Sequence, residues 1–507
     1  MCIFPFGAPA ERGFLMKYNS TRSDCSASAA QAIIDGIAPD GGLYTPADFS
    51  CMQVDPVTIL STRTTELFTE VIWKLLPEFP RSDVSAMVEA AYTDKFDASD
   101  ITPLEKIGDR FVLELYHGPT AAFKDVALSL LPLLLQYCRN SLGLTEKIVI
   151  LTATSGDTGK AALEGFRDVE GTNIIVFYPD KGVSDIQRAQ MVTQAGSNVT
   201  VCAVKGNFDD AQSGVKAVFA DDLLNHWSSM HSARLTSANS INLGRLVPQT
   251  AYYFKAYSDL VLTGEVRLGD KVDFVVPTGN FGDILAGEFA RRMGLPVGRL
   301  ICASNANNVL TDFIRTGLYD RRREFHKTIS PSMDILVSSN LERYLYLVSG
   351  GDTQFVSGAM RSLTENGCYQ IPDTVLSSIR QTFSSYFATD EETMKIIHDV
   401  WHEHEYLIDP HTAAAWSAMD KYVKEGNGER PIVVLSTASP FKFARDVLEA
   451  VSGEKARGGF AAMEKLSSLT NMPIPPQLAA LRGKRARFRD CIEQSEMLGF
   501  VKGVLES

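Results

Sequence analysis

The sequence predicts an open α/β fold, in which mostly parallel strands are covered by helices on both faces. The first observation is a set of short apolar runs: "RFVLELY", "KIVILTA", "NIIVFYP", "NVTVCAV", "KVDFVVP", "RLICAS" and "PIVVLST". They are rich in valine and isoleucine and bounded by glycine, proline and asparagine, as buried parallel strands are. The second is that helical stretches alternate with these runs. The third is the length of 507 residues, which exceeds one ordinary core and predicts two or three domains.

The bulk composition indicates a folded globular chain of the size of an enzyme, and we expect no nucleic-acid or membrane partner. Hydrophobic residues make up 45% of the chain, and the net charge of −12 would repel a polyphosphate backbone. The most basic runs, at 319–325 and 482–490, are short and lie in no recognised nucleic-acid module. The longest apolar stretch, at 126–138, is too short to span a bilayer and contains Pro132, so we expect a buried helix there.

The cysteines and the start of the chain suggest a cytoplasmic protein. The 8 cysteines are scattered without a C-x-x-C pair, which suits reduced thiols. Residues 1–15 lack the basic region of a signal peptide and the arginine-rich pattern of a transit peptide. We expect them to be an extension ahead of Met16, a candidate start.

The order of elements predicts where ligands bind. Helical patterning dominates from 27 to 95, for example at 65–76, and the strand-and-helix alternation begins at about 111. Ligands of open α/β sheets bind beyond the carboxyl ends of the strands. The turns after 117, 153, 277 and 435 are therefore the candidate sites.

The turn "TSGDTGK" at 154–160 follows a strand and opens a helix, so its free N–H groups predict an anion site. It superficially matches the nucleotide-binding pattern G-x-x-x-x-G-K-[ST]. Thr154 stands where the first glycine belongs and Ala161 where the magnesium-binding hydroxyl belongs. A nucleotide-binding protein is therefore disfavoured.

Lys124 in "HGPTAAFKDVALSLL" stands near the start of a markedly apolar helix. Burial would lower the pKa of its amine and make it a nucleophile at neutral pH. A lysine that reaches the surface or pairs with Asp125 is an equally good interpretation of these residues alone.

Two more strand ends carry polar loops. "TGNFGD" at 278–283 could surround a phosphate with backbone N–H groups, or be a tight turn in which Asp283 caps a helix. Thr437 and Ser439 could meet a ligand or simply form a strand-to-helix turn. Together the segments suggest a cofactor with an aldehyde and a phosphate.

Six segments in order resemble threonine synthase, a pyridoxal-phosphate enzyme of fold type II, the fold of the tryptophan synthase β chains. They are "HGPTAAFKD", "TATSGDTG", "SANSIN…GRL…PQ", "PTGNFGD", "SPSMDILVSSNLER" and "STASPFKF". The resemblance covers the chain from about Lys17 to its C-terminal region and is closest to the long form of the family. It implies two open, mostly parallel α/β domains and a helical N-terminal region.

The resemblance also implies domain bounds. Residues 16–105 would form the helical N-terminal region. Residues 106–130 and 265–507 would form the large domain that binds pyridoxal 5'-phosphate. Residues 131–264 would form a smaller α/β domain that carries the loop for the substrate carboxylate. A monomer and a homodimer both remain open.

Site roles follow position by position from the resemblance. Lys124 would bear the cofactor and be the catalytic residue, and Thr437 would meet the pyridine nitrogen. The loop for the cofactor phosphate would comprise Gly279, Asn280, Phe281 and Asp283. The substrate-carboxylate loop would comprise Ser155, Gly156, Asp157, Thr158 and Gly159. Asp157 stands where many relatives in the wider fold have asparagine, so its role stays open.

The phosphate of the substrate has its own candidates, which are Asn239, Ser240, Asn242 and Arg245. Arg245 suits bidentate contact, although a structural arginine paired with a neighbouring helix is nearly as good an interpretation. His117 is a further candidate that would contact the cofactor or fill the end of the sheet.

Two histidine motifs carry no assigned chemistry. His398 and His402 have zinc-site spacing, but Asp399 is shorter than the required Glu and no third ligand is indicated, so we expect no metal. His411 in "DPHTAAAW" is expected only near a helix start.

The implied activity is that of a pyridoxal-phosphate-dependent carbon-oxygen lyase. It would convert O-phospho-L-homoserine and water to L-threonine and phosphate by γ-elimination and β-addition, the last step of threonine biosynthesis. The main alternative is a related phospho-lyase that releases 2-oxobutyrate from O-phosphothreonine or O-phosphohomoserine. A noncatalytic sensor of amino acids or of the cofactor would tolerate loss of Lys124, which this chain keeps.

Overall fold

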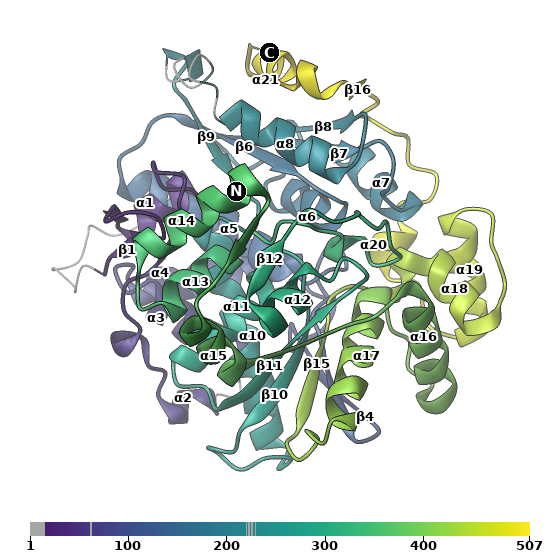
Figure 1. Ribbon diagram of the computed structural model, residues 1–507. Helices are drawn as coiled ribbons and strands as arrows, with labels where there is room; N and C mark the ends of the chain where they lie inside the picture. The colour runs from purple at the N-terminus through teal and green to yellow at the C-terminus, as the bar shows by residue number, and fades with distance from the viewer. Residues whose placement is uncertain are drawn as a thin grey trace.

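The computed structural model describes residues 16–60, 63–219, 221, 224, 227, 228 and 230–506. Its centre is formed by two sheets, one of six strands and one of five, each with helices packed against it (Figure 1). All seven apolar runs of the sequence form strands, so the predicted α/β class is confirmed. The expectation of an extension at residues 1–15 lies outside the described residues.

The five-stranded sheet has the order β16-β8-β7-β6-β9, and all its pairings are parallel. Its strands are β6 (Lys147–Ala153), β7 (Thr172–Pro179), β8 (Val199–Val204), β9 (Ala233–Ser237) and β16 (Cys491–Ile492). Its helices are α6 (Asp157–Gly165), α7 (Asp185–Val192) and α8 (Phe208–Phe219). The interior of β6 is apolar and buried throughout, as a central parallel strand requires.

The six-stranded sheet has the order β14-β11-β10-β15-β5-β4, with only the edge strand β4 antiparallel to its neighbour. Its strands are β4 (Leu104–Ile107), β5 (Arg110–Glu114), β10 (Val272–Pro277), β11 (Val297–Ser304), β14 (Phe383–Phe387) and β15 (Ile432–Ser436). Helices near it are α5 (Lys124–Ser141), α10 (Leu243–Leu262), α11 (Gly282–Arg292), α12 (Val309–Thr316), α15 (Asp373–Thr382), α16 (Asp390–His404) and α17 (Pro410–Lys424).

Helix α5 is the predicted buried helix that follows the strand β5. It packs against α6 of the five-stranded unit and against α4 (Arg81–Tyr92) and α10. Pro132 lies inside it, and most of its residues are buried. Because Lys124 is its first residue, the helix fixes that side chain between the two sheets. No helix in the described part of the chain is long and apolar enough to cross a membrane.

The N-terminal region is helical, as expected, but it also contains a small antiparallel sheet that the sequence analysis did not anticipate. Its elements are β1 (Tyr18–Ser20), β2 (Ser26–Ala27), α1 (Ala29–Asp35), β3 (Tyr44–Pro46), η1 (Ser50–Met52), α2 (Pro56–Ile59), α3 (Thr64–Leu75) and α4 (Arg81–Tyr92). Helix α3 coincides with the helical pattern at 65–76 and packs on α10.

A further segment lies between α12 and β14 in the chain. It comprises β12 (Leu318–Asp320), η2 (Pro331–Met333), α13 (Leu341–Val348), α14 (Thr353–Asn366) and β13 (Cys368–Gln370). β12 and β13 pair with each other and not with the main sheets. The 3-10 helix η2 brings residues 331–333 to the ends of the strands.

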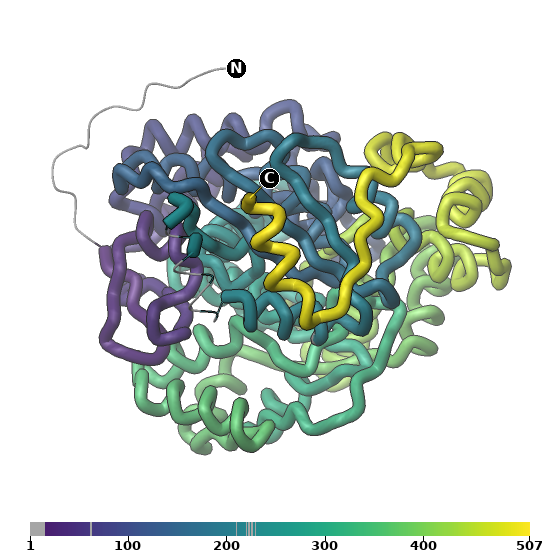
Figure 2. The backbone as a smooth tube through the Cα atoms, turned by 90° about the horizontal axis from the view of Figure 1, so that it is seen from above, coloured from purple at the N-terminus to yellow at the C-terminus, as the bar shows by residue number. Residues whose placement is uncertain are grey.

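The C-terminal region returns to the five-stranded sheet. It comprises η3 (Pro440–Phe443), α18 (Ala444–Ser452), α19 (Gly459–Thr470), α20 (Pro476–Ala479), η4 (Gln494–Glu496) and α21 (Met497–Glu506). Figure 2 shows this yellow segment crossing back over the blue strands and helices. The strand β16 pairs with β8, whereas the sequence analysis assigned these residues to the larger unit. A strand of two residues carries no detectable pattern, so sequence could not place it.

Candidate active site

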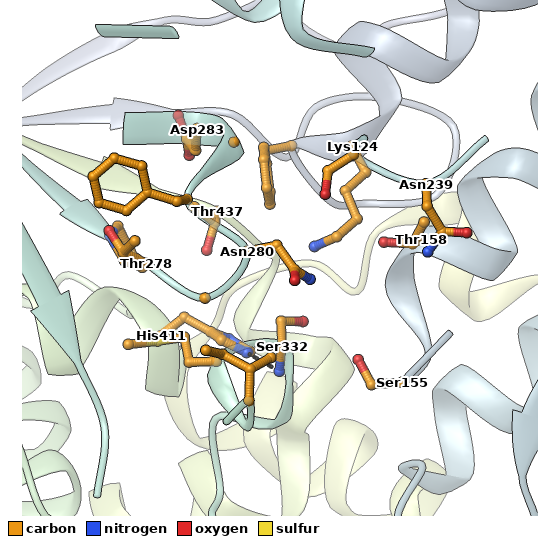
Figure 3. Close-up of a pocket in the computed structure, with 18 of the residues that line it drawn as sticks. Lys124, Ser155, Thr158, Asn239, Thr278, Asn280, Asp283, Ser332, His411 and Thr437 are labelled. Carbon is orange, nitrogen blue, oxygen red and sulfur yellow. Dashed lines mark hydrogen bonds between the residues drawn. The ribbon is translucent and has the colours of Figure 1, made fainter. Parts of the chain in front are cut away.

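A cavity lies where the carboxyl ends of strands from both sheets meet. Eleven of the residues singled out from the sequence line it, namely Lys124, Ser155, Thr158, Asn239, Ser240, Arg245, Gly279, Asn280, Phe281, Asp283 and Thr437. Figure 3 shows the Lys124 amine pointing into this cavity, with Asn280 on one side and Thr158 and Asn239 on the other. Five others do not line it: His117, Gly156, Asp157, Gly159 and Asn242.

Lys124 is buried, and its side chain lines the cavity. Its Nζ lies 4.2 Å from the ring centre of Phe123, and within the described part of the chain it makes no hydrogen bond or ion pair. Asp125 instead accepts from the backbone N–H of Thr120 at 2.9 Å and from its hydroxyl at 2.6 Å. Burial lowers the pKa of Lys124 to about 8. Both the surface position and the pairing with Asp125 are therefore ruled out.

The loop at 279–282 is shaped for close approach. A Cβ on Gly279 would lie 2.6 Å from the carbonyl oxygen of Ser332, so only glycine fits there. Phe281 takes a left-handed conformation, φ 61°, immediately before α11 begins. Its ring stacks on that of Phe383, which stabilises this unusual backbone. The N–H groups of the first turn of α11 thereby form a potential anion site beside the cavity.

Asp283 lies in that first turn, and among the described residues only one of its two carboxylate oxygens has hydrogen-bond partners. Its Oδ1 accepts the hydroxyls of Tyr252 at 2.5 Å and Tyr253 at 3.1 Å. Its Oδ2 is buried and has no hydrogen-bond partner among the described residues. Burial raises the pKa of this carboxyl to about 6. A donor or a bound group would satisfy the free oxygen.

The loop at 154–159 is folded around the side chain of Thr154. Its hydroxyl oxygen accepts the N–H groups of Gly156 at 2.9 Å and Gly159 at 2.8 Å. This turn directs Ser155 and Thr158 into the cavity. Gly156 and Gly159 serve the turn itself, because a Cβ on either would lie within 3 Å of neighbouring side chains.

Asp157 does not line the cavity, and its carboxylate pairs with a lysine. Its Oδ1 lies 2.6 Å from Nζ of Lys442 and accepts Nε2 of Gln187 at 2.7 Å. Burial alone would raise the pKa of this carboxyl, but the charges of Lys442 and Lys124 hold it well below its ordinary range. Asp157 is thus an anion at neutral pH.

The segment at 239–245 divides between the cavity and the scaffold. Arg245 is buried and lines the cavity. Its Nη1 donates to the carbonyl oxygen of Ala238 at 2.5 Å, and its Nε has no hydrogen-bond partner among the described residues. Burial lowers the pKa of its guanidinium to about 10. Asn242 instead caps α10: its side chain accepts the N–H of Gly244 at 2.8 Å and donates to Ile33 and Ser237. Its side chain is fully used by the scaffold.

His117 belongs to a separate cluster. Its Nδ1 lies 2.6 Å from Asp97 and its Nε2 lies 2.7 Å from Glu114. Burial lowers the pKa of the imidazole, but hydrogen bonds to the two carboxylates outweigh burial and raise it to about 9. The structure therefore places this ring at the end of the sheet and not in the cavity.

Sequence reasoning missed several residues of the cavity. Ser332, Met333, Asp334 and Ile335 line it, and so does His411. The motif "SPSMDIL" was part of the resemblance but carried no role, and His411 was assigned no chemistry. Lys442 was missed although it stands in the quoted segment "STASPFKF". Only the fold brings these residues together.

The donor set fits pyridoxal phosphate. A buried free amine matches the aldehyde, the N–H groups of the 279–282 loop match the phosphate, and the hydroxyl of Thr437 and the ring of Phe123 are available to the pyridine. The described residues contain no group of three or more His, Cys, Asp or Glu that could hold a metal ion. His398 and His402 lie on α16 and do not line the cavity, whereas His411 at the start of α17 does.

Comparison with known proteins identifies the matching families. The model for "Pyridoxal-phosphate dependent enzyme" matches residues 99–438, "Threonine synthase N terminus" matches 17–92 and "Threonine synthase, C-terminal" matches 412–498. The threonine synthase of Saccharomyces cerevisiae is 37% identical over 86% of this chain and 89% of that protein. Human "Threonine synthase-like 1" is 38% identical over 83% of this chain. This chain spans only 58% of that longer relative.

Solved structures agree with these matches. The PLP-bound threonine synthase from Brucella melitensis superposes with a TM-score of 0.83 at 36% identity, covering 97% of this chain and 100% of that chain. The yeast threonine synthase superposes with a TM-score of 0.85 at 34% identity, covering 98% of this chain and 99% of that chain. The likeness therefore extends over the whole described fold.

Proposed function

This chain belongs to the threonine synthase family of pyridoxal-phosphate-dependent enzymes, and we propose that it converts O-phospho-L-homoserine and water to L-threonine and phosphate. The observation that carries the proposal is the buried amine of Lys124, which has no hydrogen-bond or ion-pair partner among the described residues and shares the cavity with two loops that each lead into a helix. One loop, at 279–282, begins α11, and the other, at 154–159, begins α6. A cofactor phosphate and a substrate carboxylate would each need one such loop.

The residues that would hold the cofactor are those already found around the cavity. Lys124 would bond its aldehyde carbon, and the loop of Gly279, Asn280, Phe281 and Asp283 would hold its phosphate. Thr437 would offer a neutral hydroxyl to the pyridine nitrogen. When bound, pyridoxal phosphate acts as the electron sink that makes the protons beside the substrate's amino-bearing carbon removable.

Lys124 would also move the protons of the reaction. A pKa of about 8 leaves part of its amine uncharged at neutral pH, so that Nζ can act as a base. Nζ would take the α proton and then relay protons at the β carbon, where water finally adds. Phosphate leaves from the γ carbon, so the atoms of water appear in threonine and not in phosphate.

Two groups of side chains would orient the substrate. Ser155 and Thr158, with the N–H groups of their loop, would bind the substrate carboxylate. Asn239, Ser240 and Arg245 would bind its phosphate, because Arg245 is a buried cation with an unused donor on the cavity wall. Arg245 lies on α10 and lines the same cavity as Ser155 and Thr158, which supports a substrate that carries two anionic groups.

A reducing compartment, the cytoplasm, is part of the proposal. It is supported by the cysteines of the described residues, all seven of which are free.

A product assay tests the function. Purified protein with pyridoxal phosphate is offered O-phospho-L-homoserine and then O-phospho-L-threonine, and the products are identified by mass spectrometry. The proposal predicts threonine from the first substrate, and Lys124→Ala should abolish both turnover and the covalent retention of cofactor after borohydride reduction. Release of 2-oxobutyrate without threonine would instead identify a phospho-lyase.

A further inference from the structure

A buried ion pair joins the two sheets beside Lys124. The amine of Lys442 lies 2.6 Å from Oδ1 of Asp157, and their side chains are 0% and 2% exposed. Asp157 begins α6, which follows β6 of the five-stranded sheet. Lys442 lies in η3, which follows β15 of the six-stranded sheet. The pair therefore links the two sheets at the place where the cavity lies.

A closed ring of hydrogen bonds fixes the pair. Gln187 donates to Asp157 at 2.7 Å, and the N–H of Ser184 donates to Oε1 of Gln187 at 3.2 Å. The hydroxyl of Ser184 donates to the carbonyl oxygen of Lys442 at 3.2 Å. Gly156 leaves room for this arrangement, since a Cβ there would lie 2.6 Å from the Gln187 amide. Neither partner of the ion pair can move without breaking the ring.

The pair also reaches the chain that leads into Lys124. Nζ of Lys442 donates to the carbonyl oxygen of Thr120 at 3.0 Å, four residues before Lys124. On the other side, the hydroxyl of Ser332, a cavity residue, donates to Oδ2 of Asp157 at 3.4 Å. The pair thus contacts both the segment that carries the amine and the segment that covers the cavity.

The two charges act on the Lys124 amine in opposite directions. After burial, which is the largest effect, Asp157 raises the pKa of Lys124 and Lys442 lowers it. Removing Asp157 alone would leave a buried cation near the amine, and removing Lys442 alone would leave a buried anion. Removing both would leave neither.

We propose that Asp157 and Lys442 form a charge-balanced positioning unit, in which Lys442 orients Asp157 and cancels its charge at the Lys124 amine. Because the two charges cancel, an aspartate can occupy position 157 without keeping the amine of Lys124 protonated. The inference rests on the proposed function only in that Lys124 is the reacting amine. Lys442 itself is a positioning residue, since it does not line the cavity.

Other charged groups also face the amine and must stay constant in any test. They are Arg245 of α10 and Asp283 of α11, which act on the pKa of Lys124, together with Asp334 and His411, which line the same cavity. None of them contacts the Asp157 or Lys442 side chain through a hydrogen bond within the described residues. Substitutions in the pair therefore leave their contacts in place.

The test measures the protonation of Lys124 directly. The full chain, before cofactor is added, is pulsed with acetic anhydride at a series of pH values, and acetylation of Lys124 is quantified by mass spectrometry. Lys455, whose side chain is 79% exposed, serves as the internal reference. A shift of one pH unit in the midpoint changes the labelling rate below that midpoint by about tenfold.

Three variants give a signed prediction. Lys442→Met should move the Lys124 midpoint to higher pH, and Asp157→Asn should move it to lower pH. The double variant should return it toward the starting value. The visible absorption of added pyridoxal phosphate should develop faster with Asp157→Asn and more slowly with Lys442→Met than with the parent chain. The reason is that the uncharged amine of Lys124 is the form that reacts.

A matched control separates positioning from general stability. Lys160 is another buried lysine, paired with Glu164 at 2.9 Å on the same helix as Asp157. Lys160→Met should lower the thermal stability without moving the Lys124 midpoint. A Lys160 variant that moves the midpoint as far as the Lys442 variant would overturn the proposal.

Other outcomes decide equally clearly. Single variants that leave the midpoint unchanged, or move it in the same direction, overturn the proposal. If Lys442→Met does not fold, Asp157→Asn and the double variant still decide, because the second substitution must reverse the shift of the first. The labelling does not require turnover, so a chain that makes no threonine can still support this inference, and a threonine synthase can still refute it.

Discussion

Nε2 of His411 accepts the backbone N–H of Ser332 at 3.1 Å, while its Nδ1 lies 2.6 Å from Oδ1 of Asp409. The imidazole therefore carries its proton on Nδ1, and this N–H donates a hydrogen bond to the carboxylate. The side chains of His411 and Asp409 are buried, and Asp409 also caps α17. The ring thus fastens the 331–333 segment over the 279–282 loop.

Replacing His411 by Phe should loosen this segment, since it removes the acceptor but keeps a ring. Losing this hydrogen bond and leaving the half-buried N–H of Ser332 unpaired costs about 1–3 kcal/mol. We expect about a tenfold or greater rise in the dissociation constant of pyridoxal phosphate, measured by equilibrium dialysis. His411→Gln, which can still accept, should recover part of the affinity. Equal affinities in all three proteins would contradict a fastening role.

Gly279→Ala should damage the cofactor loop, because the added Cβ would lie 2.6 Å from a backbone oxygen of the covering segment. Backbone contacts of this kind relax only by moving the segment. We expect at least a tenfold loss of cofactor affinity in the same dialysis assay. The control is Gly358→Ala in the interior of α14, where nothing lies within 4 Å. That change should leave affinity intact and raise stability by about 0.5–1 kcal/mol.

Arg245→Met should weaken the binding of the substrate more than the binding of the cofactor. A hydrogen bond to a charged group contributes about 1.5–3 kcal/mol, so kcat/KM for O-phospho-L-homoserine should fall by about ten- to a hundredfold. Arg245→Lys should restore only part of it, since an ammonium cannot make a bidentate contact. Steady-state kinetics alongside cofactor dialysis would decide. A loss confined to cofactor affinity would show that Arg245 binds the phosphate of the cofactor and not that of the substrate.

Asp283 should make stability depend on pH. Its folded pKa of about 6 lies above the ordinary value of 3.8, so it contributes stability that is fully present below about pH 4 and is lost as pH rises through 6. The shift of roughly two units corresponds to about 3 kcal/mol at most. Urea unfolding of the cofactor-free chain at pH 4.5 and pH 7 should show a smaller decline for Asp283→Asn than for the parent. Parallel declines would refute the raised pKa.

The strands were predictable because their residues are buried on both faces. Such strands are continuous apolar runs, and β6 and β10 illustrate this pattern clearly. The edge strand β14, "FSSYF", contains two serines and was missed, since part of it faces polar surroundings. Lys124 drew attention as a lysine at the start of an apolar helix, but the residues alone left a surface or paired lysine equally good, and its role came from the family resemblance.

The remaining site residues depend on distant contacts. Ser332 and His411 are 79 positions apart, and no local pattern announces that they meet. Asn242 is different, because asparagine just before a helix is a common cap and the sequence could have suggested that role. The pairing of His117 with Glu114 is local, but its bond to Asp97 is not.

The fate of the oxygen atom of water tests the proposed reaction most directly. Turnover of O-phospho-L-homoserine in water enriched in oxygen-18 should place the label in the hydroxyl group of threonine, because water adds at the β carbon after phosphate has left from the γ carbon. The released phosphate should carry no label from the reaction. Label in the phosphate, with unlabelled homoserine as the product, would show simple hydrolysis of the phosphate ester and would contradict the proposed function.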